Sequence, residues 1–180
     1  NKNRVETSQA KIFRSLGDQT KFLYKNLNFT LTNSQINVLK DIRTDLSSGK
    51  PMNRLIQGDV GCGKTIVAAL TASIVVSEGC QVAIMAPTEI LAEQHYNNFY
   101  NKFKKTDIKC KLLISNLKKD KKDKIYNDLK KLDIDIVIGT HALIQDKVHF
   151  KKLALIIVDE QHRFGVDQRK KIIDKGENPH

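Results

Sequence analysis

The stretch that most constrains the fold is Gly58-Asp59-Val60-Gly61-Cys62-Gly63-Lys64-Thr65, which fits the pattern G-x-x-x-x-G-K-[ST] at every fixed position. In such a loop, glycines let the backbone curl so that its N–H groups point at phosphate oxygens, and the lysine adds a positive charge where the next helix begins. The threonine then offers its hydroxyl to Mg²⁺. The stretch therefore predicts a phosphate-binding loop, with Lys64 as the cation that acts in catalysis and Thr65 as a metal ligand.

The residues on either side of the loop agree with this prediction. Upstream, Arg54-Leu55-Ile56-Gln57 follows Pro51 and predicts a short strand, whereas Ile66 to Val76 is almost continuously apolar and predicts a buried helix. Strand, loop and helix then occur in the order that a phosphate-binding loop requires. The alternative is a plain turn between a strand and a helix, and this context counts against it.

Length and charge limit the number of domains and the kinds of partner that the chain can have. A chain of 180 residues with 40% apolar content makes one domain of ordinary size. Its net charge of +11 indicates an anionic partner larger than a nucleotide, although charge alone does not choose between nucleic acid and membrane. No stretch approaches the length of a membrane span and no leader opens the chain, so we expect a cytoplasmic protein without a membrane partner. Three widely spaced cysteines fit a reducing compartment.

The sequence predicts two regions in the chain. Residues 1–28 are polar and mixed, and they predict a partly mobile lead-in segment. Residues 29–180 are expected to form the nucleotide-binding domain. Within it, Thr32-Asn33-Ser34-Gln35 has the spacing of a capping box, which predicts a helix from about Asn33 to Leu46.

Apolar runs and helical patterns alternate through the rest of the chain. The runs predict four strands: Gln81 to Ala86, Lys109 to Ser115, Ile134 to Ile138 and Leu153 to Val158. The last two are too continuously apolar for a sheet with one face in water. Helices are expected between them, after Thr88 and from Leu117 to Leu132. This alternation predicts an α/β fold of the P-loop NTPase type, a three-layer sandwich with a mainly parallel central sheet and helices on both faces.

Two helical features have competing interpretations. Ala92, Tyr96, Phe99 and Phe103 form one stripe at helical spacing, and we interpret it as core rather than as a platform on which bases stack. The run Lys118-Lys119-Asp120-Lys121-Lys122 is interpreted as a solvated face rather than as a binding site.

A second chemical feature follows the last apolar run, which ends abruptly in Asp159-Glu160-Gln161-His162. The carboxyl end of a strand in a parallel nucleotide-binding sheet is the edge at which a phosphate loop also lies. Asp159 is suited to hold Mg²⁺, usually through water, and Glu160 is suited to orient and deprotonate an attacking water as the catalytic base. An acidic cap on the strand is the alternative, and the phosphate loop upstream favours the site.

These residues resemble a known family. The four residues 159–162 are similar to the DEAD-type box of superfamily 2 helicases, and their continuation Arg163-Phe164-Gly165-Val166 resembles RecG and the transcription-repair coupling factors. Three further stretches favour the RecG family: Gln57 to Gly61, Met85 to His95 and Gly139 to Gln145. The resemblance extends over roughly residues 22–180.

The resemblance implies a RecA-like fold and an ATP-dependent translocase on double-stranded DNA that uses Mg²⁺ and remodels stalled forks and Holliday junctions in recombination and repair. It implies that Gln35 reads adenine, that Phe29 stacks near the base, and that Gln161 and His162 couple hydrolysis to movement. Thr88, Thr140 and His141 match motifs that touch the DNA backbone. The alternative for Gln35 is a structural role in the capping box, and the alternative for His141 is that it is an ordinary polar residue at a strand end.

The chain also departs from the family's pattern. Cys62 stands where the family usually has serine, and Asn28 stands where a proline commonly precedes Phe29. The family's wedge domain is expected upstream, and its second helicase lobe with an arginine finger is expected after Pro179-His180. We therefore expect the chain to be a first helicase lobe. The alternatives are the corresponding lobe of a transcription-repair coupling factor and an ATP-binding switch module without DNA-motor activity.

Overall fold

The computed structural model describes residues 9–59 and 61–180. Within these residues, short apolar runs form the strands of one parallel sheet. The sheet contains β1 (Gln81–Met85), β2 (Cys110–Leu113), β3 (Ile136–Gly139) and β4 (Leu153–Val158). The strand order is β2-β3-β1-β4, and every pair is parallel. The four strands expected from the apolar runs after residue 80 are therefore confirmed.

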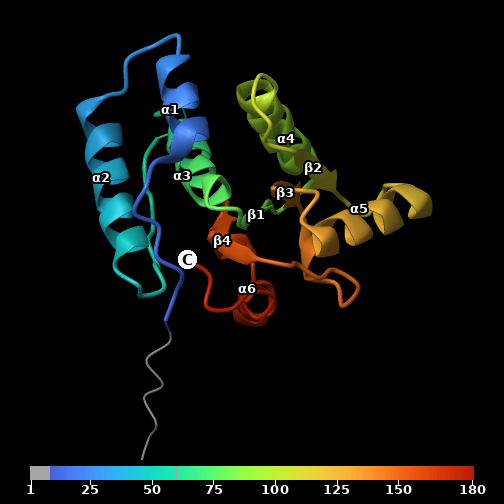
Figure 1. The fold of residues 1–180 in the computed structure, drawn as a ribbon. Helices are drawn as coiled ribbons and strands as arrows, with labels where there is room; N and C mark the ends of the chain where they lie inside the picture. Colours follow the sequence, from blue (N-terminus) through green and yellow to red (C-terminus); the bar gives the residue numbers. More distant parts are fainter. Residues whose placement is uncertain (1–8, 60) are drawn as a thin grey trace, which may run out of the picture.

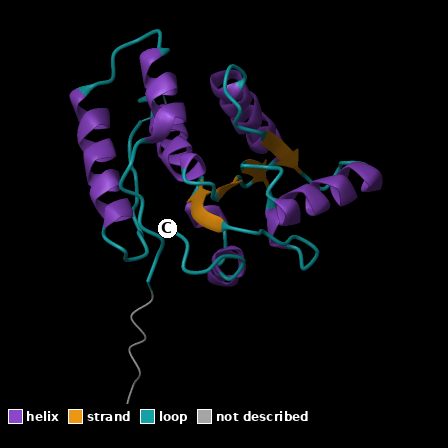
Figure 2. Cartoon of the chain, in the orientation of Figure 1, coloured by secondary structure: helices purple, strands orange, loops and turns teal. Residues whose placement is uncertain are grey.

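Helices cover both faces of this sheet (Figure 1). The α-helices are α1 (Gly17–Lys25), α2 (Asn33–Ser47), α3 (Lys64–Ser77), α4 (Glu89–Phe103), α5 (Lys119–Lys131) and α6 (Val166–Ile173), and the short 3₁₀ helices are η1 (His141–Ile144) and η2 (Gln161–Arg163). α1 to α4 lie on one side of the sheet, and α5 and α6 lie on the other (Figures 1 and 2).

The central strand β1 shows why both faces must be covered. Its residues are all buried, and their side chains alternate between two apolar clusters. Val82 and Ile84 pack in the cluster that includes α3 and α4, whereas Ala83 and Met85 pack in the cluster that includes α5 and α6. The three-layer α/β sandwich with a parallel central sheet is thus confirmed.

The described part of the lead-in segment packs against the sandwich. α1 contacts α3, where Leu23 is buried and the hydroxyls of Thr20 and Ser73 form a 2.9 Å hydrogen bond. Phe13, ahead of this helix, is also buried. Residues 1–8 lie outside the described residues, and the domain boundary at residue 28 stays a prediction.

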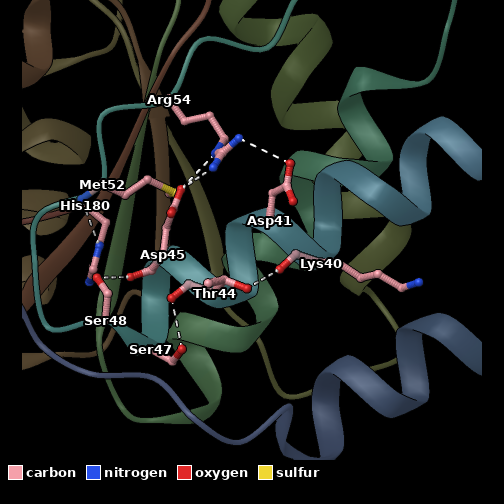
Figure 3. Close-up of polar contacts among 9 residues, drawn as sticks. All are labelled: Lys40, Asp41, Thr44, Asp45, Ser47, Ser48, Met52, Arg54 and His180. Atoms are coloured by element: carbon pink, nitrogen blue, oxygen red, sulfur yellow. Dashed lines mark hydrogen bonds and ion pairs between the residues drawn. The ribbon is translucent and has the colours of Figure 1, made fainter.

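The prediction of a strand at residues 54–57 is wrong. This segment is irregular and exposed, and it runs back along α2 toward the start of α3 (Figures 1 and 2). Arg54 forms ion pairs with Asp45 at 2.7 Å and Asp41 at 3.5 Å, and the N–H of Met52 donates to Nδ1 of His180 (Figure 3).

The physical reason is that a strand exists only through hydrogen bonds to a neighbour. The outer edge of β4 bonds instead to His180, whose N–H donates to the carbonyl of Ala154 and whose carbonyl accepts from Ile156, at 2.8 and 2.9 Å. The apolar side chains Leu55 and Ile56 consequently remain 61% and 36% exposed.

A buried glutamine at the start of β1 joins three elements. The side-chain amide of Gln81 donates to the carbonyls of Leu129 and Ile134, each at 2.9 Å. Its carbonyl oxygen accepts from the backbone N–H groups of Lys151 and Lys152 at 2.9 and 3.0 Å. Because Gln81 is 0% exposed, this one side chain satisfies backbone groups at the end of α5, before β3 and before β4.

We expect Gln81→Ala to lower the free energy of unfolding by about 3 kcal/mol or more, because it leaves buried donors and acceptors unpaired and opens a cavity. Urea denaturation followed by circular dichroism measures this change. Asn127→Ala on the exposed face of α5 is the matched control, with an expected change within about 0.5 kcal/mol. Equal midpoints for the two variants would contradict the role given to Gln81.

Candidate nucleotide-binding site

The loop before α3 adopts a backbone conformation that requires glycine. Gly61 and Gly63 have φ angles of +85° and +83°, in the left-handed region that other residues rarely adopt. Gly63 also caps α3, and a Cβ atom on it would collide with the side-chain amide of Gln35. Geometry therefore favours glycine at both positions, and only Gly63 is also a fixed position of the sequence pattern.

Lys64 is the first residue of α3, so its ammonium and the helix N-terminus lie together. Its Nζ donates to the carbonyls of Gly58 and Asp59, the latter at 3.1 Å, and thus lies across the loop. The first N–H groups of a helix have no partner within the helix and carry partial positive charge. Lysine, helix end and glycine backbone together form a site suited to an anion such as a phosphate group. Val60 lies outside the described residues.

The donor set fits a nucleoside triphosphate with Mg²⁺. Open space surrounds the position where a Cβ on Gly61 would lie, so a phosphate group can approach the backbone there. The described residues contain no group of three or more His, Cys, Asp or Glu side chains that could enclose a metal. Mg²⁺ is commonly bound by only one or two protein ligands together with phosphate oxygens and water, and the Thr65 hydroxyl and Asp159 carboxylate supply that kind of ligand.

Gln35 connects α2 to the loop. Its Oε1 accepts from the N–H of Thr32 at 2.9 Å while the Thr32 hydroxyl accepts from the N–H of Gln35 at 3.2 Å, so the capping box is formed. Its Nε2 donates to the carbonyl of Cys62 at 3.0 Å, a contact that the sequence did not indicate. Both ends of the amide are thus engaged, and its role toward adenine stays a proposal. Phe29, 48% exposed, lies just ahead of the same helix.

The two carboxylates after β4 have different surroundings. The N–H of Asp159 donates to the carbonyl of Met85 at 2.9 Å, and its carboxylate contacts Nε2 of His95 on α4 at 2.7 Å. Glu160 adopts a left-handed conformation with φ of 51°, which costs a non-glycine residue about 1 kcal/mol. Its carboxylate is half-exposed and lies 3.1 Å from Nε2 of His162. The chain therefore turns sharply at Glu160, immediately after the strand.

His95 has no role at the nucleotide site in the sequence analysis; the resemblance implies only that the pair Gln94-His95 belongs to the motifs that touch the DNA backbone. It occurs within the stretch Met85 to His95, but its spacing alone does not show which strand end it reaches. The contact arises because β1 and β4 are neighbours and α4 follows β1. Gln161 and His162 lie in η2, where the side-chain carbonyl of Gln161 accepts from Arg169 at 3.3 Å and His162 is exposed.

The three residues expected to contact DNA differ in exposure. Thr88 is exposed and caps α4, because its hydroxyl accepts from the N–H of Leu91 at 3.2 Å. Thr140 is only 1% exposed, and its hydroxyl has no hydrogen-bond partner among the described residues. His141 is exposed at the rim of a cleft of about 810 Å³. Four lysines and two aspartates also line this cleft: Lys119, Lys122, Lys147, Lys171, Asp123 and Asp146.

The chain has a glycine-rich loop that leads into a buried helix and an acidic pair at the end of a parallel strand. These features define a P-loop nucleotide-binding protein. Residues 32–177 match the DEAD/DEAH box helicase family, and the chain belongs to that family.

Within this family, the chain is similar to the DNA helicase RecG of two bacteria. The chain is 52% identical over 155 residues to the ATP-dependent DNA helicase RecG of Bacillus subtilis, and 52% identical over 165 residues to that of Aquifex aeolicus. These alignments cover 86% and 89% of this chain but 23% and 21% of the relatives. The chain thus spans under a quarter of the length of the curated relatives that it matches.

Solved structures agree with the sequence comparison. A structure of RecG bound to a three-way DNA junction superposes with a TM-score of 0.83 and 48% identity, over 89% of this chain and 22% of that one. A hypothetical ATP-dependent RNA helicase from Sulfolobus tokodaii shares the fold with a TM-score of 0.67 at 17% identity, over 89% of this chain and 47% of that one. In the described part of the chain, every helix is too short or too polar to cross a membrane.

Proposed function

We propose that the chain is the ATP-binding first lobe of a RecG-like translocase on double-stranded DNA that remodels stalled forks and Holliday junctions. The observation that carries this proposal is the match to RecG on a DNA junction, at 48% identity and a TM-score of 0.83 over 89% of the chain. The second helicase lobe and the wedge domain would be partners within the same longer protein. A cytoplasmic location stays a prediction.

In the proposed mechanism, the loop N–H groups and Lys64 hold the β- and γ-phosphates of ATP. Thr65 and Asp159 would hold Mg²⁺, which when bound neutralises charge on the phosphate oxygens. Glu160 orients the attacking water and accepts its proton, and its half-exposed carboxylate is accessible for this role. Gln35 and Phe29 are proposed to contact the adenine. The hydrogen bond from Gln35 to the carbonyl of Cys62 supports this role, because it brings the start of α2 next to the loop, and Phe29 lies just ahead of that helix.

The DNA backbone is proposed to lie along the carboxyl edge of the sheet. Thr88 and His141 are exposed there, directly after β1 and β3. The buried hydroxyl of Thr140 would have to move to reach a phosphate, so we assign it an indirect role beside His141. The lysines around the neighbouring cleft add positive charge to the same edge, which supports phosphate contacts with a steep dependence on salt. Two of them, Lys119 and Lys122, come from the run 118–122 that the sequence alone favours as a solvated face, so this proposal takes the alternative interpretation of that run. Gln161 and His162 are proposed to couple hydrolysis to movement of the second lobe.

A steady-state ATPase assay with and without forked DNA tests the proposal. In this class an arginine from the second lobe stabilises charge on the γ-phosphate, a contribution of about 10³ or more in rate. The 180-residue chain alone is therefore expected to bind ATP weakly and hydrolyse it very slowly. A longer form that includes the second lobe and the wedge domain should show strong stimulation by forks. Strong fork-stimulated hydrolysis by the 180 residues alone would contradict the two-lobe account.

A further inference from the structure

One contact at the nucleotide site has no part in the mechanism above. Nε2 of His95 lies 2.7 Å from Oδ2 of Asp159, and the two side chains are 22% and 33% exposed. The distance is that of a short hydrogen bond to a charged acceptor, and partial burial strengthens such a bond relative to one in open solvent.

This contact fixes the orientation of the proposed metal ligand. The backbone of Asp159 is already held by its 2.9 Å hydrogen bond to the carbonyl of Met85. His95 adds a second anchor, on the side chain, so the carboxylate has little freedom to rotate. Oδ1 has no hydrogen-bond partner among the described residues, and it is the oxygen left for a cation or for the water bound to one.

The same contact joins the metal ligand to the helix that begins at a proposed DNA contact. Thr88 caps α4, and His95 lies about two turns further along that helix. Ala92 and Phe99, at 0% and 1% exposure, anchor α4 in the core on either side of His95. A helix held in this way moves as one unit, so a displacement of its first turn by DNA also displaces the imidazole that holds Asp159.

We propose that His95 is a positioning residue that orients the Asp159 carboxylate toward Mg²⁺ and transmits the binding of DNA at the start of α4 to the metal site. The imidazole acts as a hydrogen-bond donor through Nε2–H and needs no change in its charge. Outer groups that orient a metal ligand typically contribute 10- to 100-fold to metal affinity. This inference rests on the proposed function, because it requires both the metal site and DNA binding at α4.

The experiment uses the longer protein of which this chain is proposed to be the first lobe, called here the full-length parent protein, with Mn²⁺ in place of Mg²⁺ and a non-hydrolysable ATP analogue. Electron paramagnetic resonance of free Mn²⁺ measures metal affinity without any turnover. His95→Ala is expected to weaken Mn²⁺ affinity about tenfold and His95→Gln, which keeps a donor, to restore part of it. His149→Ala, at an exposed histidine between η1 and β4, is the matched control and should leave the affinity unchanged.

The coupling is tested by adding forked DNA to the same samples. DNA should change the Mn²⁺ affinity of the unmodified protein, and this change should be lost in His95→Ala. Unchanged Mn²⁺ affinity in His95→Ala would overturn the inference. Equal losses of Mn²⁺ affinity in His95→Ala and His95→Gln, together with a lowered melting temperature, would also overturn it, because they would show a purely structural role. Asp159→Asn distinguishes failure of the inference about His95 from failure of the proposed metal site. If Asp159→Asn weakens Mn²⁺ binding while His95→Ala does not, only the inference about His95 fails. If Asp159→Asn has no effect, the proposed metal site itself fails.

Discussion

Lys64→Ala is expected to abolish measurable binding of Mg-ATP, with a loss in affinity of about 100-fold or more. Without the ammonium, the N–H groups of the loop alone face the charge of the β- and γ-phosphates. The geometry supports a large effect, because Lys64 begins α3 and its Nζ already lies across the loop, against the carbonyls of Gly58 and Asp59. Titration calorimetry of Mg-ATP into the full-length parent protein measures the change.

Lys104→Ala is the matched control for this variant, since Lys104 is an exposed lysine at the end of α4, outside the loop. Its affinity for Mg-ATP should equal that of the unmodified protein. Thermal unfolding of both variants confirms that the fold is retained. If Lys64→Ala bound Mg-ATP as tightly as Lys104→Ala does, residues 58–65 would not be the phosphate site.

The elements that could be predicted from the sequence are those whose burial is nearly complete. Every residue of β1 is buried, and α3 is buried over most of its length, so these positions select mainly apolar side chains, apart from polar residues that are hydrogen-bonded in the interior such as Gln81 and Ser73. The loop between residue 58 and α3 could be located for a related reason. The left-handed conformation at Gly63 excludes most other residues, and Gly63 is one of the fixed positions by which the pattern is recognised.

The strand predicted at residues 54–57 shows where this reasoning fails. An apolar run indicates that a segment could be buried, but pairing with a neighbouring strand decides whether it becomes part of a sheet. Here the acidic residues of α2 bind Arg54, and the outer edge of β4 bonds to His180. The pairing of β4 with His180 cannot be read from the sequence, because no local pattern around residue 180 predicts which strand edge it reaches.

Contacts between polar residues that are distant in the sequence could likewise not be predicted from it. The bond from Gln35 to the carbonyl of Cys62 and the bond from His95 to Asp159 each join segments that only the fold brings together. The four hydrogen bonds of Gln81 are of the same kind, because one glutamine at the start of an apolar strand has no distinctive spacing. Local patterns therefore predict the chemical groups of the proposed site, whereas the contacts that hold those groups in place are known only from the structure.

The second large effect is expected at the proposed catalytic base. Glu160→Gln in the full-length parent protein should retain ATP and slow its hydrolysis by about 10²- to 10⁴-fold, because glutamine can orient a water but cannot accept its proton. The substitution preserves the size of the side chain, and Glu160 is a half-exposed residue, so the left-handed turn at this position should persist. Single-turnover hydrolysis and equilibrium binding of ATP, measured on the same protein, separate the two effects.

Asp159→Asn is the comparison that distinguishes a base from a metal ligand. Loss of the Asp159 charge should weaken binding of ATP in the presence of Mg²⁺ as well as hydrolysis, whereas Glu160→Gln should change hydrolysis alone. The different surroundings of the two carboxylates support this division, since Asp159 is held by His95 and the backbone of Met85 while Glu160 projects from a turn toward His162. Normal turnover by Glu160→Gln would show that another group accepts the proton, and weakened Mg-ATP binding by Glu160→Gln would assign Glu160 to the metal instead.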